Sequence, residues 1–256
     1  MDAKKQNNLN NPTYSESAIL YERLRPKYPC SLYNYILELT ESHHSAWDVA
    51  CGTGQVSTEL SKSFNHVIAS DPSEHQLELT PKLKNVKYII AKELIPEENQ
   101  SMDLITCATA IHWMNRKKFF KECDRLLKPN GLLAIWGYTG INLNPELDKG
   151  IMEIIQKYFL PYYPDKINIA FNQYQKIDTP YNQIETPKFH IKKKWELKDF
   201  IDYFNSFSAM QEMYRLKKFK TIEKVQFEFS EIWGEKNKSK EIQWNFITHF
   251  SRKPKT

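Results

Sequence analysis

Short apolar segments alternate with stretches of helical periodicity through the first 140 residues of the chain. Apolar runs bounded by turn-forming residues are typical of buried strands, and they cover residues 46–50, 67–70, 86–91, 103–108 and 132–138. Apolar positions recur at helical spacing in residues 56–63, 75–79 and 117–127. Strands and helices in this order predict a doubly wound α/β fold with a mostly parallel sheet and helices on both faces. Ligands of such open sheets bind outside the carboxyl ends of the strands.

The rhythm changes after residue 140, where the elements become longer and less regular. An irregular segment rich in Tyr, Asn and Pro extends to residue 187. The periodicity around it predicts a helix over 146–159, a strand over 190–195, helices over 197–216 and 221–233, and a last strand over 243–251. We expect this half to insert a segment over the sheet and then to complete the sheet.

Composition places the chain among globular proteins, with 41% hydrophobic and 13% aromatic residues. The chain contains no apolar run long enough to cross a membrane, and its polar first residues lack a signal core, so we expect a cytoplasmic protein with no membrane partner. The four cysteines are not spaced as zinc ligands, so we expect reduced thiols and no metal site.

The formal charge of +5 comes from residues 141–256, where basic residues are interleaved with acidic and aromatic ones. Such a modest and mixed excess is typical of a solvated surface rather than of a nucleic-acid interface. Nucleic acid is therefore not the expected partner.

A glycine turn follows the first predicted strand, in the sequence DVACGTGQ of residues 48–55. The chain has only seven glycines, and two of them, Gly52 and Gly54, lie one residue apart in this turn. A strand, a glycine turn and a helix in succession let a backbone approach a nucleotide-like ligand closely. A dinucleotide fingerprint would need a third glycine at position 57, where this chain has Ser57, which argues against an NAD site.

Two carboxylates narrow the class of ligand that this turn can bind. Asp48 precedes the turn, where an anion would oppose a pyrophosphate but favour a cofactor that carries an amine. Asp71 ends the second predicted strand, where a carboxylate can accept hydrogen bonds from both hydroxyls of a ribose. These positions indicate a cationic adenosine cofactor.

Five segments in order resemble the class I S-adenosylmethionine-dependent methyltransferases, in the methyltransferase type 11 branch that includes the trans-aconitate methyltransferases. The segments are AILYERLRPKYP, DVACGTGQ, SDPS, SMDLITCATAIHW and RLLKPNGLLAIW. The resemblance covers residues 14–138 and is looser beyond them. It implies S-adenosyl-L-methionine as the cofactor and a Rossmann-like sheet of seven strands with an antiparallel last strand.

The resemblance also implies a domain plan and a set of cofactor-binding residues. We expect a disordered tail over 1–13 and one methyltransferase domain over 14–256. Its expected parts are an N-terminal helical cap (14–45), a cofactor-binding core (46–140), a substrate lid (141–187) and late core elements (188–256). The cofactor-binding residues implied are Tyr21, Arg25, Asp48, Ala50, Cys51, Gly52, Thr53, Gly54, Asp71, Pro72, Ala91, Lys92, Thr109 and His112.

The sequence departs from the family pattern at three positions. Ala50 stands where many relatives have a glycine, which we expect to be tolerated through a strand-like φ. Relatives often have an acid near residues 90–92 that binds the adenine amine, and here only Glu93 is available. Phe207 stands where relatives often have Trp.

The acceptor expected from the resemblance is a small molecule, with a carboxylate or hydroxyl oxygen as the nucleophile. In-line methyl transfer mainly requires alignment of the nucleophile and exclusion of water. His112 is the candidate general base, and a structural role for it stays open. Trp113 is either a packing residue or part of the acceptor site. The other residues expected to line the acceptor pocket are Tyr138, Tyr162 and Tyr163.

Two other hypotheses stay open. One is a catalytically silent cofactor-binding or interaction protein on the same fold, which the absence of an adenine acid at residues 90–92 would suit. The other is an RNA or protein methyltransferase. The fourth strand is followed by Thr109, Ala110, Ile111 and His112, which lack the Asn-Pro-Pro-Tyr-like tetrad of adenine methylation, and Cys107 is not in a Pro-Cys pair.

Overall fold

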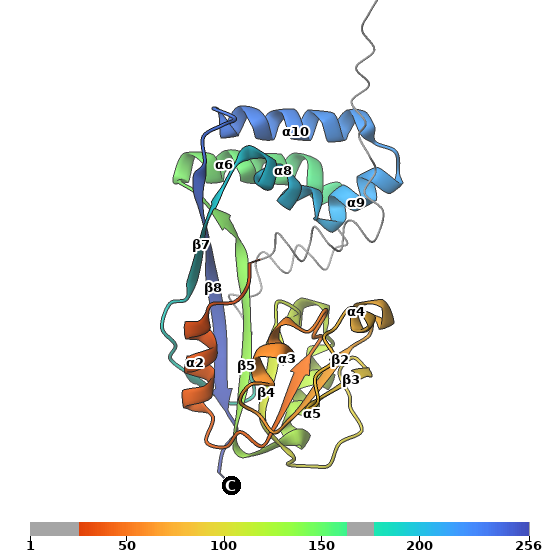
Figure 1. Cartoon of the computed structure of the whole chain (residues 1–256), viewed down its shortest axis with the longest axis vertical. Coiled ribbons are helices and arrows are strands. Elements are labelled where there is room, and N and C mark those ends of the chain that lie inside the picture. Colours follow the sequence, from red (N-terminus) through yellow and green to blue (C-terminus); the bar gives the residue numbers. More distant parts are fainter. Residues whose placement is uncertain (1–25, 163–176, 256) are drawn as a thin grey trace, which may run out of the picture. The chain divides into compact units, whose positions relative to one another are not determined.

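The computed structural model describes residues 26–162 and 177–255, and their contacts divide them into two compact units (Figure 1). The sheet unit contains the described residues 27–141, 177–191 and 243–255. The helical unit contains Pro26 and residues 142–162 and 192–242. Every described residue from the glycine turn to residue 138 belongs to the sheet unit.

The apolar runs of the first 140 residues form parallel strands. They are β1 (Ser45–Val49), β2 (His66–Asp71), β3 (Val86–Ile90), β4 (Met102–Ala108) and β5 (Leu127–Asn142). Strands β1, β2, β3, β4 and β5 pair in parallel in the order β3-β2-β1-β4-β5, which confirms the expected centre of the fold. The crossovers return each strand in the same direction, so the carboxyl ends of β1, β2 and β4 share one edge.

The sheet has eight strands in the described part of the chain, so the expected seven is wrong. The remaining strands are β6 (Asn182–Ile184), β7 (His190–Trp195) and β8 (Lys240–Arg252). Strand β8 lies between β5 and β6, pairs with β6 in antiparallel orientation, and also pairs with β7. The three residues of β6 form no apolar run that could reveal the strand; only Ile184 is apolar, and it packs against the core beside its partner Phe250 of β8.

Alternate residues of the central strands enter two separate cores. Trp47 and Val49 of β1 pack on one face, where α5 (Arg116–Leu126) contributes Phe119 and Cys123. Ala46 packs on the other face with residues of α2 (Cys30–Leu39) and α3 (Gln55–Leu60). Alternation on strands covered on both sides is the physical basis of the doubly wound fold. A short helix, α4 (Glu74–Glu78), follows β2.

Residues 128–131 lie within β5 but interrupt its pairing with β4. The register shifts between the Leu127–Met102 pair and the Leu132–Leu104 pair, and Asn130 has a left-handed φ of +66°. Pro129 lies near the start of this strand, where the missing N–H is tolerated.

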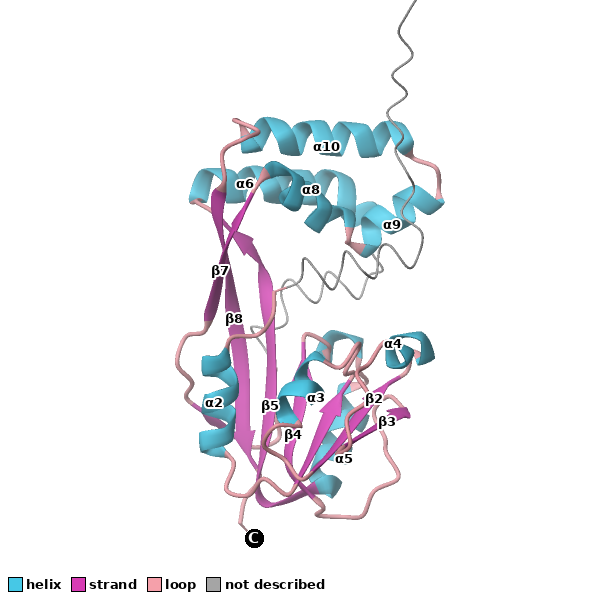
Figure 2. Cartoon of the chain, viewed as in Figure 1, coloured by secondary structure: helices cyan, strands magenta, loops and turns pink. Residues whose placement is uncertain are grey.

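The helical unit has its own aromatic core. Its helices are α6 (Pro145–Ile154), α8 (Leu197–Asn205), α9 (Ser208–Arg215) and α10 (Phe219–Trp233), as Figure 2 shows. A π-helical turn over Ile155–Phe159 continues α6, and a 3-10 turn over Leu160–Tyr162 follows. Phe159, Phe204 and Phe229 pack ring against ring and are nearly inaccessible to solvent. At the crossing of α6 and α10, a Cβ on Gly150 would lie 2.8 Å from Ile232 Cδ1, so these helices meet closely.

The single helix expected over 197–216 is in fact two. The helical hydrogen bonds end at Ser206, whose hydroxyl donates to the Tyr203 carbonyl oxygen at 2.6 Å, and Phe207 is extended before α9 begins. Helices α8, α9 and α10, which we expected among the late core elements, group with α6 of the proposed lid. The division into one core and a lid over 141–187 stays a prediction.

Every helix in the described ranges is too short or too polar to cross a membrane.

Candidate functional site

The turn between β1 and α3 is built from left-handed residues. The φ angles are +52° at Ala50, +55° at Gly52 and +86° at Gly54. The expected strand-like φ at Ala50 is therefore wrong: the alanine adopts the conformation that its Cβ disfavours and that a glycine would adopt freely. Among the described residues, a Cβ on Gly52 would approach only Gln76 Oε1, at 3.8 Å, whereas one on Gly54 would lie 3.2 Å from Tyr88 Oη. The space beside Gly52 is open to a ligand.

Backbone hydrogen bonds fasten this turn to the end of β2. The Cys51 N–H donates to the Ser70 carbonyl oxygen at 3.0 Å, and the Gly54 N–H donates to the Cys51 carbonyl oxygen at 2.9 Å. Cys51 and Thr53 are half-buried. Burial raises the pKa of the Cys51 thiol, so this side chain stays protonated.

Asp48 holds the turn from within the sheet unit. Its carboxylate accepts hydrogen bonds from the Ser57 N–H at 2.9 Å and from the Thr106 hydroxyl at 3.0 Å. The side chain is buried, and this burial raises its pKa to about 7 even though the hydrogen bonds from Thr106 and Ser57 oppose the shift. The carboxylate therefore joins β1 to the first turn of α3 and to β4. Its expected role toward a cofactor amine stays a prediction.

Asp71 connects the turn to the end of β2. One carboxylate oxygen accepts from the Gly52 N–H at 3.0 Å, and the other accepts from the Ser73 N–H at 2.9 Å. Each oxygen of a carboxylate has a second lone pair, so both can still accept a ligand hydroxyl. Asp71 lies 8% exposed at the carboxyl edge of the sheet, beside the exposed Pro72. This position suits the expected ribose contact, which stays a prediction.

The segment after β3 is anchored at both Asp71 and α5. The Ala91 N–H donates to the Asp71 carbonyl oxygen at 3.2 Å. Lys92 is exposed and lies 3.5 Å from the Glu93 carboxylate. Glu93 Oε1 accepts from the Asn115 N–H at 2.8 Å, at the start of α5. Glu93, the acid considered as a partner of the adenine amine, therefore holds this segment against the start of α5.

The end of β4 carries a second group of candidate residues. Thr109 has a left-handed φ of +53°, and its N–H donates to the Trp136 carbonyl oxygen at 2.7 Å. His112 and Trp113 follow in a 3-10 turn, η1 (Ile111–Trp113), with ring centroids 5.0 Å apart. Trp113 is 45% exposed, so it is not a fully packed residue, and its place in an acceptor site stays a prediction.

Tyr28 joins this group, although our sequence analysis gave it no role. Its hydroxyl lies 2.9 Å from the Thr109 hydroxyl, and its ring packs edge to face against Trp136 and Phe246. The segment RLRPKYP contained the only signal, an aromatic residue between two prolines. Because 81 residues separate Tyr28 from Thr109, sequence spacing could not reveal the contact.

The register of the sheet brings the two groups to one edge. Val49 of β1 pairs with both Ser70 of β2 and Cys107 of β4, so the glycine turn, Asp71 and Thr109 all follow neighbouring strand ends. Tyr138 is also in the sheet unit, with its ring edge against Phe246. Of the remaining candidates, Tyr162 belongs to the helical unit, and Tyr21, Arg25 and Tyr163 lie outside the described residues.

Across residues 26–162 and 177–255, no group of three or more His, Cys, Asp or Glu side chains is placed to hold a metal ion.

The chain is similar to known methyltransferases in sequence and in fold. A family model described as a methyltransferase domain matches residues 47–135. A Dictyostelium discoideum protein named as a methyltransferase is 31% identical over 196 residues, which are 74% of each chain. A Saccharomyces cerevisiae protein named as an S-adenosylmethionine-dependent methyltransferase is 32% identical over 128 residues, 46% of this chain and 44% of that one. A solved structure from Anaeromyxobacter dehalogenans, named as a type II methyltransferase, shares the fold with a TM-score of 0.78 and 24% identity, covering 90% of this chain and 99% of that one.

Proposed function

Because the chain belongs to the class I S-adenosylmethionine-dependent methyltransferases, we propose that it methylates a carboxylate or hydroxyl oxygen of a small molecule. The observation that carries the choice of a small acceptor is the contact between Tyr28 and Thr109. This contact lays the segment before α2 against the end of β4, where the reacting groups are expected. Partial cover of this strand end, where Thr109 is half-buried, favours a small acceptor over a polymer, which needs an open approach.

The residues at the sheet edge fit S-adenosylmethionine. Beside Gly52, the nearest heavy atom of the described residues to an added Cβ would be Gln76 Oε1 at 3.8 Å, so the backbone there leaves space for a ligand. Asp71 lies next to it with lone pairs available for hydroxyls. We propose that residues 50–54 and Asp71 hold the cofactor, and that Ala91 and Lys92 lie beside its adenine. When bound, the cofactor supplies a methyl group on a sulfonium, which needs no covalent help from the protein.

The chain's own residues then have to align the acceptor and exclude water. We propose that His112 and Trp113 of η1 contact the acceptor. His112 either removes a proton from a hydroxyl acceptor or serves as a structural hydrogen-bonding group. A carboxylate acceptor is already ionised at neutral pH and needs no base, so the two nucleophiles predict different effects of a His112→Gln substitution on activity.

Substitution of Asp71 tests the cofactor site. We expect Asp71→Ala to weaken binding of S-adenosylhomocysteine by roughly 100-fold, because hydrogen bonds to a charged group contribute about 1.5–3 kcal/mol each. Isothermal titration calorimetry measures this affinity. Glu38→Ala removes an exposed carboxylate from the same unit, outside the proposed cofactor site, and serves as the control. Equal affinities of the two variants would remove Asp71 from the site.

A screen of acceptors tests the class of substrate. Small carboxylic acids and phenols are incubated with the protein and with cofactor carrying a labelled methyl group, and transferred label is counted. We expect label in small acceptors. Label found only in added RNA or protein would overturn the proposed acceptor while leaving the cofactor site intact.

A further inference from the structure

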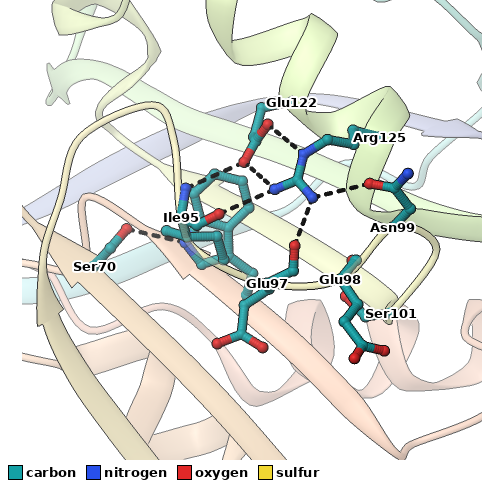
Figure 3. A network of polar contacts seen from close by, with 9 residues as sticks. Ser70, Ile95, Glu97, Glu98, Asn99, Ser101, Glu122 and Arg125 are labelled. Carbon is teal, nitrogen blue, oxygen red and sulfur yellow. Dashed lines mark hydrogen bonds and ion pairs between the residues drawn. The ribbon is translucent and has the colours of Figure 1, made fainter.

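The guanidinium group of Arg125 in α5 binds Glu122 of the same helix and three residues of the loop between β3 and β4 (Figure 3). Two of its nitrogens donate to the Glu122 carboxylate, at 2.9 and 2.6 Å. The other donors reach the carbonyl oxygens of Ile95 (3.0 Å) and Glu97 (2.5 Å) and the side-chain oxygen of Asn99 (3.1 Å). These contacts occupy all five N–H donors of the side chain.

Glu122 completes the arrangement. Its side chain is buried, and besides Arg125 it accepts a hydrogen bond from the Ile95 N–H at 3.1 Å. The pair therefore satisfies both backbone groups of Ile95, a residue that is itself buried in the core beneath α5. Residues 91–101 form no helix or strand; the Ile95 carbonyl oxygen also accepts from the Glu97 N–H at 2.9 Å, whereas the Ile95 N–H donates to Glu122.

The opposite end of this segment is also fixed. Glu93 accepts from the Asn115 N–H at the start of α5, and the Ala91 N–H donates to the Asp71 carbonyl oxygen. The segment thus runs from the backbone of Asp71, the candidate ribose-binding residue, to α5. It is held by hydrogen bonds at Ala91, Glu93, Ile95 and Glu97. Its first residues, Ala91 and Lys92, are those proposed to lie beside adenine.

We propose that Glu122 and Arg125 are positioning residues for the cofactor: they hold residues 91–99 against α5 and so keep the adenine end of the site in its binding geometry. The inference rests on the proposed cofactor site. Neither side chain contacts the cofactor, because both are directed to the segment between β3 and β4 (Figure 3). Loss of the pair would leave these residues to be ordered on binding, and ordering a residue's backbone is costly in entropy.

This role predicts an effect on affinity and not on the chemical step. We expect Arg125→Met to lower the affinity for S-adenosylhomocysteine, and for adenosine, by roughly 10-fold or more each, since both ligands contain adenine. The KM for S-adenosylmethionine should rise by a similar factor while kcat changes less than about two-fold. Arg125→Lys should give much the same loss, because an ammonium has only three donors and cannot reproduce the planar fork.

Arg252 provides a matched control in the same unit. It is half-buried, and its guanidinium donates to the carbonyl oxygens of Asn130 (2.9 Å) and Leu39 (2.6 Å), far in sequence from residues 91–99. Arg252→Met removes similar contacts to backbone carbonyls, so it measures the general effect of destabilisation. We expect it to leave both ligand affinities within about two-fold of wild type.

Calorimetry on the full-length chain, combined with hydrogen exchange of residues 91–99, tests the inference. Faster exchange of these amides in Arg125→Met, with slow exchange recovered at saturating S-adenosylhomocysteine, would support it, and hydrogen exchange with Arg125→Lys gives the same test if the Met variant does not fold. Equal losses of affinity in the Arg125 and Arg252 variants, or unchanged affinity in the Arg125 variants, would overturn it. If wild-type protein does not bind S-adenosylhomocysteine, the proposed cofactor site itself fails, so the two failures are distinguishable.

Discussion

At the scale of single residues, the Asp48 side chain stabilises the fold at the position where we expect the cofactor to bind. An acid in an apolar strand before a glycine turn marks the position in the sequence. The structure adds that both carboxylate oxygens are engaged, by the Ser57 N–H and the Thr106 hydroxyl, inside the sheet unit. Burial of an ionisable group disfavours its charged form, which explains the raised pKa.

This raised pKa predicts that stability depends on pH. The pKa of Asp48 is about 7 in the folded protein and about 3.9 in an unfolded chain. The unfolded state therefore loses its proton first as the pH rises. The contribution of Asp48 to the free energy of unfolding is greatest below about pH 4 and falls by up to roughly 4 kcal/mol as the pH approaches 7.

Asp48→Asn tests this linkage, because the amide keeps a hydrogen-bonding group at the site but does not titrate. We expect the free energy of unfolding of wild type, measured with urea between pH 4 and 7.5, to fall more steeply with pH than that of the variant. Glu98→Gln, which alters an exposed carboxylate, should follow wild type. Identical pH slopes for wild type and Asp48→Asn would show that Asp48 ionises normally.

At the scale of elements, the turn between β1 and α3 combines open space with backbone strain. Three of its residues, Ala50, Gly52 and Gly54, are left-handed. The glycines adopt this conformation without a steric cost, but Ala50 does not. The sequence located this turn correctly, but the strand-like φ expected at Ala50 is wrong. The apolar pattern of a strand does not show at which residue the chain begins to turn.

Two substitutions in this turn should act in opposite directions. Gly54→Ala places a Cβ 3.2 Å from Tyr88 Oη on a residue with φ +86°, and we expect it to lower the free energy of unfolding by about 1–2 kcal/mol. Ala50→Gly relieves a similar strain, offset by the greater entropy that glycine has in the unfolded chain, so we expect a change between zero and about +1 kcal/mol. Urea denaturation measures both. A destabilised Ala50→Gly variant would contradict the strain at Ala50.

At the scale of the whole molecule, the described candidates for cofactor binding all belong to the sheet unit. The helical unit has its own aromatic core, built by α6, α8, α9 and α10, and contains the acceptor candidate Tyr162. The other described acceptor candidates, His112, Trp113 and Tyr138, belong to the sheet unit, so the helical unit contributes to acceptor binding alone. This division predicts where a cofactor acts on stability.

Ligand linkage tests that prediction. A ligand that binds only the folded protein stabilises it by about 2.7 kcal/mol at a concentration of 100 times its Kd. We expect S-adenosylhomocysteine to slow hydrogen exchange mainly in residues 46–54, 66–73 and 86–99 of the sheet unit. Protection confined to residues 192–242 would contradict the assignment of the cofactor to the sheet unit.

The sequence by itself determined the parallel centre of the sheet, the glycine turn and the two acids near the strand ends, and its resemblance to a protein family indicated the cofactor. These features depend on local patterns, since apolar periodicity and the spacing of turn residues follow from neighbours along the chain. Only the tertiary structure decided that Thr106 reaches Asp48, that Tyr28 reaches Thr109, and that Arg125 holds the segment after β3. It also grouped α8, α9 and α10 with α6 and revealed the polar strand β6. These contacts join residues far apart in the sequence, and neither periodicity nor spacing records which distant side chains meet when the chain packs.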